Sequence, residues 1–235
     1  MKVRYLIKFT KDDSIKFIAH LDLMRTIQKI VRRAELPVEY SKGFNPHMAL
    51  SMAQPLSVGH SSNGDYLDLV LAEELDEDTI KNKLNELSNV GIKFLEVKKV
   101  INNPNEKKVP QGMALIDAAT YTVKIKYSGN DNIVKEIEEL LESPKMEIIK
   151  KSKKGEKMVD IKPHILGASV SKEDEYVIIN LEAACGSRNH LSPELFATYI
   201  KEHTKGSVEN AFTYINRIEM FANKDNKLVP LYKYV

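Results

Sequence analysis

The segment Val3-Arg4-Tyr5-Leu6-Ile7-Lys8-Phe9, with the helical pattern that follows it, decides the fold of this chain. Apolar side chains recur at every second position of the segment, which is the period of a strand with one buried face. Apolar residues then recur at helical spacing over residues 21–34, and Pro37 ends that helix. The change of period predicts a strand followed by a helix that packs on it.

Similar patterns continue along the first half of the chain. Strands are expected near residues 49–53 and over 66–71, and a final strand over 92–97. A helix is expected over residues 80–87, and the acidic residues at 76–78 suit its N-terminus electrostatically. The resulting order is βαββαβ, the split βαβ arrangement of ferredoxin-like folds.

The second half repeats the order of elements rather than the sequence. The expected elements are a strand over 121–127, a helix over 133–141, a hairpin over 146–161, a strand over 176–181, a helix that starts at Ser192-Pro193-Glu194 and a last strand over 211–220. Residues 102–113 carry two prolines and little periodicity, which is typical of a linker. We therefore expect an α+β fold of two tandem ferredoxin-like halves, with a first half over 1–101, a linker over 102–113 and a second half over 114–235.

The composition is that of an ordinary globular protein, with 43% hydrophobic and 29% charged residues. Cys185 is the single cysteine, so this chain cannot hold an iron–sulfur cluster or form a disulfide by itself. The histidines show no metal-binding spacing, and no apolar run approaches the roughly 18 residues of a membrane span. We expect a cytoplasmic protein with no metal and no cofactor of its own.

The net charge of +2 is too small to indicate nucleic-acid binding, so such an interpretation depends on clustering of the cations. Arg25, Lys29, Arg32 and Arg33 recur at helical spacing opposite the apolar stripe of the first expected helix. Such a surface can follow phosphates, and arginine adds bidentate hydrogen bonds. The alternative is the solvated outer surface of a helix that packs on the core.

The loop after this helix combines several groups that bind RNA. Lys42, Phe44, Asn45 and His47 supply a cation, an aromatic ring, an amide and an imidazole within six residues. These groups contact phosphate, stack on unpaired bases and read base edges. The alternative is a turn in which Phe44 packs into the core and Asn45-Pro46 sets the bend.

Two further features are candidates for contacts with RNA. His20 lies at the expected start of the first helix, where an imidazole could act as a general base, although a lone histidine is more often structural. Lys151, Lys153 and Lys154 belong to a lysine-rich hairpin tip in the second half, which either reaches phosphates or is a solvated turn.

The runs His20-Leu21-Asp22-Leu23-Met24-Arg25, Arg32–Pro37 and Tyr40–His47 resemble the radical-SAM-linked family of unknown function. In that family a comparable unit occurs alone or fused behind a B12-binding radical-SAM enzyme. The resemblance implies a radical-SAM enzyme as partner, with S-adenosylmethionine and an iron–sulfur cluster in that enzyme only. Its specific part is the first 70 residues or so, and Met48-Ala49 departs from the proline and lysine common there.

Three functions follow as hypotheses. The leading one is an RNA-binding or substrate-presenting accessory module that works with a radical-SAM enzyme in RNA modification. The second is a metal-independent endoribonuclease with His20 as base, because the expected layout is similar to that of CRISPR repeat-processing enzymes in topology alone. The third is a protein–protein adaptor that docks through the aromatic loop.

Overall fold

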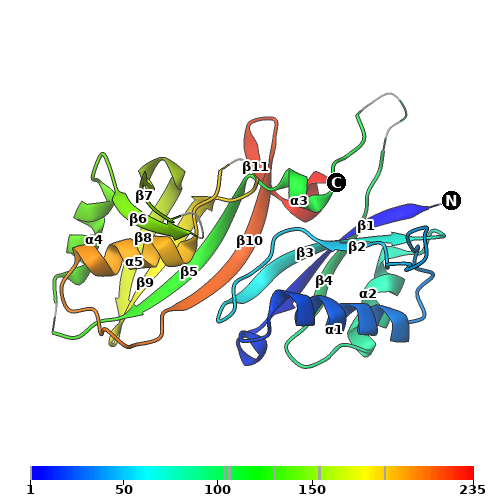
Figure 1. The fold of residues 1–235 in the computed structure, drawn as a ribbon, viewed down its shortest axis with the longest axis horizontal. Helices are drawn as coiled ribbons and strands as arrows, with labels where there is room; N and C mark the ends of the chain where they lie inside the picture. The colour runs from blue at the N-terminus through cyan, green and yellow to red at the C-terminus, as the bar shows by residue number, and fades with distance from the viewer. Residues whose placement is uncertain (1, 103, 105–106, 130, 153–154, 188) are drawn as a thin grey trace. The chain divides into compact units, whose positions relative to one another are not determined.

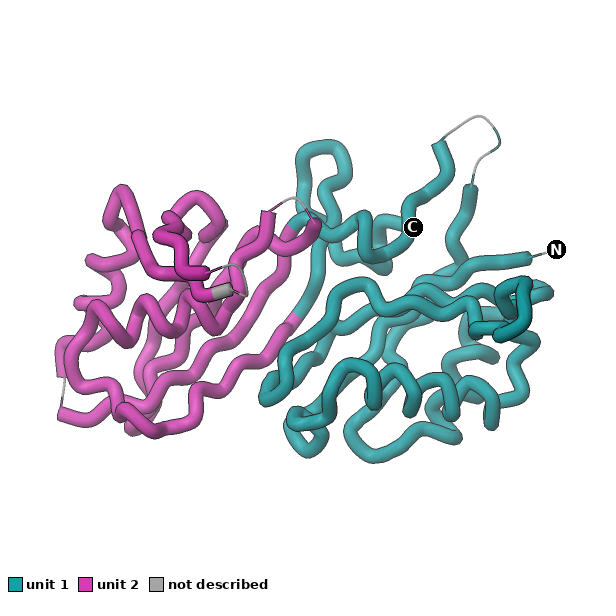
Figure 2. Tube along the Cα trace, viewed as in Figure 1, with its two compact units in different colours: residues 1–117, 219–235 teal, residues 118–218 magenta. Residues whose placement is uncertain are grey.

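A computed structural model describes residues 2–102, 104, 107–129, 131–152, 155–187 and 189–235, and the chain divides into two compact units. Unit 1 consists of Met1–Asp117 and Glu219–Val235, and unit 2 of Ala118–Ile218 (Figure 2). This division differs from the one expected from the sequence, because the last 17 residues (235 − 218) belong with the first half rather than with the second.

Unit 1 contains the first expected half and the C-terminal segment (Figure 1). Its elements in chain order are β1 (Val3–Lys11), a 3-10 turn (Asp13–Ile15), α1 (His20–Arg33), β2 (Leu50–Met52), β3 (Ser61–Leu71), α2 (Glu77–Glu86), β4 (Phe94–Lys99), α3 (Gly112–Leu115), the last part of β10 (Tyr214–Lys224), β11 (Lys227–Pro230) and α6 (Leu231–Tyr234). β1 pairs antiparallel with β3 and β4, and β2 pairs antiparallel with β3. The strand order β4-β1-β3-β2 is the one that a split βαβ pattern predicts.

The core of unit 1 forms between the apolar face of β1 and the apolar side of α1, as the strand and helix periods of the sequence predict. Val3, Tyr5, Ile7 and Phe9 are buried along β1, and the apolar side of α1 is buried with them in one cluster. Removing this apolar surface from water is the main term that stabilises the unit.

The expected linker is partly bound to unit 1. The backbone N–H of Gly112 donates to the buried Asp68 carboxylate at 2.7 Å, and Arg4 donates to the carbonyl of Val109. Gly112 lies so close to Leu6 that an added Cβ would be 3.1 Å from that side chain. A side chain at this position would therefore require its neighbours to shift by a few tenths of an ångström, and α3 begins there.

Unit 2 contains the remaining elements. In chain order they are β5 (Ala118–Lys126), α4 (Ile133–Leu141), β6 (Glu147–Ser152), β7 (Gly155–Asp160), a 3-10 turn (Lys162–His164), β8 (Ile165–Glu173), β9 (Tyr176–Ala184), α5 (Pro193–His203) and the first part of β10. Its strand order is β10-β5-β9-β8, and β6 and β7 pair only with each other among the described residues. Ser192 caps α5 as the sequence predicts, since its hydroxyl accepts from the backbone N–H of Leu195.

The mixed α and β class is confirmed. β10 contributes its residues up to Ile218 to unit 2 and its residues from Glu219 to unit 1, where β11 pairs with it. The description as two tandem ferredoxin-like halves is therefore not confirmed. β8 was also missed, because Gly167-Ala168-Ser169 is a run of small residues with no apolar alternation.

Candidate anion-binding surface on helix α1

Helix α1 presents its cations on the side opposite the core. Leu23, Ile27, Ile30 and Val31 are its buried residues. The basic residues form an exposed set, which we call the α1 surface: Arg25, Lys29, Arg32 and Arg33. Arg32 and Arg33 lie in the last turn, where positive charge interacts favourably with the helix dipole. The sequence spacing thus predicts the placement of these side chains correctly.

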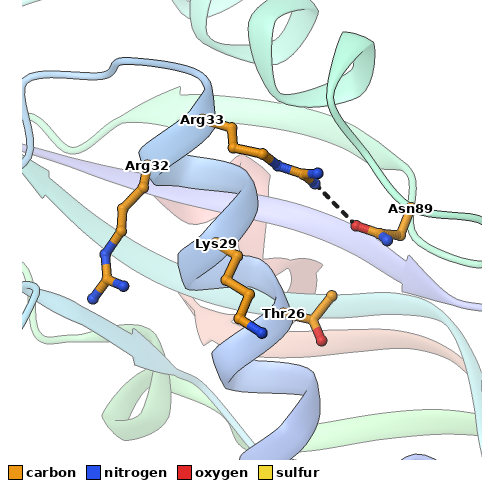
Figure 3. Close-up of a pocket in the computed structure, with 5 residues that line it drawn as sticks. All are labelled: Thr26, Lys29, Arg32, Arg33 and Asn89. Carbon is orange, nitrogen blue, oxygen red and sulfur yellow. Dashed lines mark hydrogen bonds between the residues drawn. The ribbon is translucent and has the colours of Figure 1, made fainter.

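A hollow of about 410 Å³ lies on part of this surface (Figure 3). Its lining residues are Thr26, Lys29, Arg32, Arg33 and Asn89. Arg33 extends toward Asn89, whereas Arg32 leaves the helix on the other side, with Lys29 between them (Figure 3). Three cations around one hollow make a positive local potential, which favours an anion such as phosphate.

The cations of the α1 surface differ in how firmly they are held. Arg33 donates to the Leu87 carbonyl at 2.8 Å and to Asn89 Oδ1 at 3.2 Å, so its guanidinium group is oriented. Arg25 lies outside the hollow and pairs with Asp22 at 3.1 Å. Within the described ranges, Lys29 and Arg32 form no ion pair with a carboxylate. The unneutralised charge is therefore concentrated in the C-terminal half of α1.

Asn89 was missed in the sequence. It lies in the loop between α2 and β4, and no motif there indicates a binding residue. Only the fold brings this loop beside the last turns of α1.

The loop Tyr40–His47 is closed at its base and exposed along its length. Tyr40 and Met48 form an isolated bridge, the Ser41 N–H donates to the His47 carbonyl at 2.8 Å, and the His47 N–H donates to Ser41 Oγ at 2.9 Å. Gly43 has φ +139°, which an L side chain rarely adopts.

Phe44 is exposed at 112% of its reference area, so it does not pack into the core. Lys42, Asn45 and His47 are exposed as well. The loop thus presents an aromatic ring, a cation, an amide and an imidazole to solvent. A binding loop requires this exposure, whereas a turn in which Phe44 packs into the core would bury the ring.

His20 is the first residue of α1, while Ala19 is the N-cap, so the histidine does not cap the helix. In the part of the chain that the structure describes, no hydrogen bond or ion pair to His20 is found. The partner group that a general base would need is not seen among these residues. Nor does any cluster of His, Cys, Asp and Glu there have the geometry of a metal site.

The lysine-rich hairpin is formed by β6 and β7 and belongs to unit 2. Lys150 and Lys157 are opposite each other in the register, and Lys151 pairs with Glu156 at 3.3 Å. Lys153 and Lys154 lie outside the described residues. The hairpin is thus exposed and basic, but one of its cations is already partly neutralised by Glu156.

The fold and the site together define a mixed α and β protein with a basic helix surface and an exposed aromatic loop. Residues 4–193 match the family described as "Uncharacterized protein conserved in bacteria (DUF2344)", and the chain belongs to this family. That description names neither a function nor a partner. No curated protein matches the sequence.

A solved structure shows similarity in fold. A chain in the "Crystal Structure of a Cbf5-Nop10-Gar1 Complex" is similar over 94% of this chain at 10% identity, with a TM-score of 0.51. This chain spans about half (50%) of the matched chain's length. A second chain, from the "Crystal Structure of an Unknown Protein from Galdieria sulphuraria", covers 85% of this chain and 88% of its own length at 10% identity, with a TM-score of 0.26. In the described ranges, no helix combines the length and apolar character that crossing a membrane requires.

Proposed function

We propose that this protein is an RNA-binding or substrate-presenting accessory module that works with a radical-SAM enzyme. The observation that carries the RNA part is the hollow on α1, where Lys29 and Arg32 face solvent unneutralised beside the oriented Arg33. The radical-SAM part is supported by the sequence resemblance of the runs around His20, Arg32 and the Tyr40–His47 loop.

Phosphate contacts explain why cations of this kind would be held on one surface. A protein that neutralises phosphates releases condensed counterions, so its affinity depends strongly on salt. Arg32 offers a planar fork of donors to phosphate oxygens, and Lys29 a compact charge that adapts its position. The pair would hold the backbone of an RNA strand without reading its sequence.

The exposed loop supplies the second part of an RNA site. An unpaired base can stack on the Phe44 ring, which has no partner in the core. Asn45 and His47 present groups that can hydrogen-bond to a base edge. Backbone contacts at α1 and base contacts at the loop, both in unit 1, would favour a single strand over a duplex.

Charge reversal at α1 tests this function. We expect Lys29→Glu and Arg32→Glu each to weaken binding of a labelled single-stranded RNA and to flatten the log–log salt dependence by about 0.7 units per lost phosphate contact. Both side chains are exposed, so the free energy of unfolding should change by only about 0.5 kcal/mol. Fluorescence anisotropy at several salt concentrations and thermal melting measure the two effects.

Lys135→Glu in α4 is the matched control, since it changes the charge equally on an exposed helix of unit 2. Unchanged affinity and salt slope in both α1 variants would refute the proposal. Shortening of the RNA during incubation, abolished by His20→Ala, would instead establish the nuclease function. Size-exclusion chromatography with a purified radical-SAM enzyme from the same genome tests the partnership, which fails if no candidate enzyme co-elutes.

A further inference from the structure

One face of the unit 2 sheet is not covered by the unit's helices. Tyr121, Val123 and Ile125 are buried on one face of β5, Ala118 and Ala119 are buried at its start, and α5 contacts this strand. The residues between them, at even positions 120–126, are exposed or half-buried on the opposite face. Because directly paired residues of antiparallel strands share a face, β9 adds Tyr176, Asn180 and Glu182, with the buried Ile178 among them, and β8 adds residues such as Ser169.

Three aromatic residues gather at one end of this open face, and we call them the aromatic platform: Tyr176, Phe212 and Tyr214. The ring of Tyr214 meets Tyr176 edge-on at 6.1 Å between centroids and Phe212 edge-on at 4.9 Å. Phe212 and Tyr214 remain 41% and 38% exposed. Edge-on contacts hold the rings in place while leaving ring surface for another flat group to stack on.

Cations lie beside the platform on the same face. Lys126 Nζ is 6.0 Å from the centroid of the Tyr176 ring and pairs with Glu175 at 2.8 Å, so its charge is partly neutralised. Lys124 is exposed two residues farther along β5, and its side chain is on the same face. Lys124 would therefore be the cation available to a phosphate attached to a ring on the platform.

A hollow of about 400 Å³ continues the open face along the strands. Its lining includes polar residues (Thr120, Ser169, Asn180 and Glu182) and apolar ones (Leu181 and Ile218). Gly167 also lines it and has only the Glu182 Cβ near the place where a side chain would be, at 3.9 Å, so the hollow stays open there. The Thr122 hydroxyl donates to Asn180 Oδ1 at 3.1 Å, which holds that amide on the face. From Lys126 to Thr120 the face extends for about 20 Å.

We propose that this open face is a second binding site for single-stranded RNA, in which unpaired bases stack on the aromatic platform and base edges meet the hydroxyl and amide groups of the hollow. The inference rests on the proposed function, that the chain binds RNA, and assigns a base-binding site to unit 2. Aromatic side chains on an open antiparallel sheet are a recurrent way to stack bases, and bases in a duplex are not accessible to such rings. The hydroxyl and amide groups of Thr120, Ser169 and Asn180 in the hollow can hydrogen-bond to base edges.

The absence of tryptophan from the chain allows each site to be followed separately. We would make Phe44→Trp and Tyr214→Trp as two single-tryptophan proteins and titrate each with a short oligouridylate, a short oligoadenylate and an abasic oligonucleotide of the same length. Stacking should quench the fluorescence of the Tyr214→Trp protein with both base-containing oligonucleotides and leave it nearly unchanged with the abasic one.

Affinity measurements on aromatic-to-aliphatic variants complete the test. Tyr214→Leu and Phe212→Leu keep apolar bulk and should lower oligouridylate affinity by about five-fold or more, without changing the salt slope. Tyr234→Leu is the matched control, since Lys224 Nζ lies 5.5 Å from that ring in unit 1 and no sheet-face site includes it. Circular dichroism shows whether each variant is folded.

The outcomes separate the two proposals. Quenching at position 214 together with weaker binding by Tyr214→Leu supports the second site. Quenching at position 44 alone, with Tyr214→Leu binding as the wild type does, overturns the second site and leaves the proposed function standing. If the wild type binds no oligonucleotide, both proposals fail.

Discussion

Phe44 is an exposed side chain whose substitution can separate an effect on binding from an effect on stability. A phenylalanine at 112% of its reference exposure contributes nothing to the core and offers its whole ring to a ligand. The loop around it is held by backbone and Ser41 hydrogen bonds rather than by the ring. Its substitution should therefore affect binding and stability very differently.

We expect Phe44→Ala to weaken binding of single-stranded RNA by about 1–3 kcal/mol, which is the usual contribution of one base stacked on an aromatic ring. The salt dependence of binding should stay the same, because no phosphate contact is lost. The melting temperature should not change, since the ring is exposed. Anisotropy titrations and thermal melting measure these quantities.

Phe17→Ala serves as the control, because Phe17 is another exposed aromatic of unit 1, at 64%. A large fall in melting temperature for Phe44→Ala would show that the ring packs on something in the folded protein. Unchanged RNA affinity would remove the loop from the binding site.

Among single residues, those that can be recognised from the sequence are the ones whose spacing or neighbours along the chain indicate a role. Arg25, Lys29 and Arg32 follow helical spacing, so their shared surface can be predicted from sequence. Asn89 and Tyr214 belong to sites that assemble only through tertiary contacts. No neighbour in sequence marks Asn89, and Phe212, which lies two residues from Tyr214, does not by itself indicate the contact between Tyr214 and Tyr176.

The β6–β7 hairpin shows how one side chain can hold a whole element. Asp160, at the end of β7, accepts from the Met146 N–H at 2.9 Å and from the Lys162 N–H at 3.0 Å. These backbone hydrogen bonds, helped by the charges of Lys145 and His164, lower the pKa of Asp160 below its usual value. The ionised carboxylate thus ties both ends of the hairpin together.

The stabilisation by Asp160 should therefore depend on pH. A carboxylate whose pKa is lower in the folded protein than in the unfolded chain stabilises the fold above the unfolded pKa of about 3.9 and loses this effect as pH falls through the folded pKa. We expect Asp160→Ala to lower the melting temperature at neutral pH. The difference from the wild type should shrink steadily below about pH 4.

Thermal melting of both proteins over an acid-to-neutral series tests this dependence. Glu147→Ala on the neighbouring strand is a suitable control, since Glu147 pairs only with an exposed lysine, Lys145, among the described residues. A difference between Asp160→Ala and the wild type that persists unchanged into acid would mean that the charge of Asp160 is not what stabilises the hairpin.

Helices and strands with a clear hydrophobic period can be predicted from the sequence, whereas a strand that forms only because a neighbouring strand pairs with it cannot. β1 and α1 have strong periods of 2 and 3.6 and were predicted within a few residues. β8 consists largely of small and polar residues, and it is a strand because β9 pairs with it along its length. The β-propensity of its residues alone therefore does not predict this strand.

On the scale of the whole molecule, the C-terminal segment decides how the chain is divided. Glu219 accepts from Lys8 at 2.6 Å and from the Tyr66 hydroxyl at 2.7 Å, and all three side chains lie within unit 1. Burial of Tyr66, together with the negative charge of Glu219, raises the pKa of the tyrosine. The sequence expectation placed this segment in the second half because chain order was the only guide. Pairing across more than 150 residues leaves no local trace.

Leu231 tests this division directly, because it is fully buried in α6, which contacts β1 and β4. We expect Leu231→Ala to lower the free energy of unfolding by about 2–5 kcal/mol, through lost apolar burial and the cavity left behind. Leu228→Ala, three residues earlier at a side chain that is 38% exposed, should cost much less. Hydrogen exchange should show lost protection in β1 and β3, whereas β5 and β9 should keep theirs. The reverse pattern, with unit 2 destabilised and unit 1 intact, would place the C-terminal segment with the second half, as the sequence alone predicts.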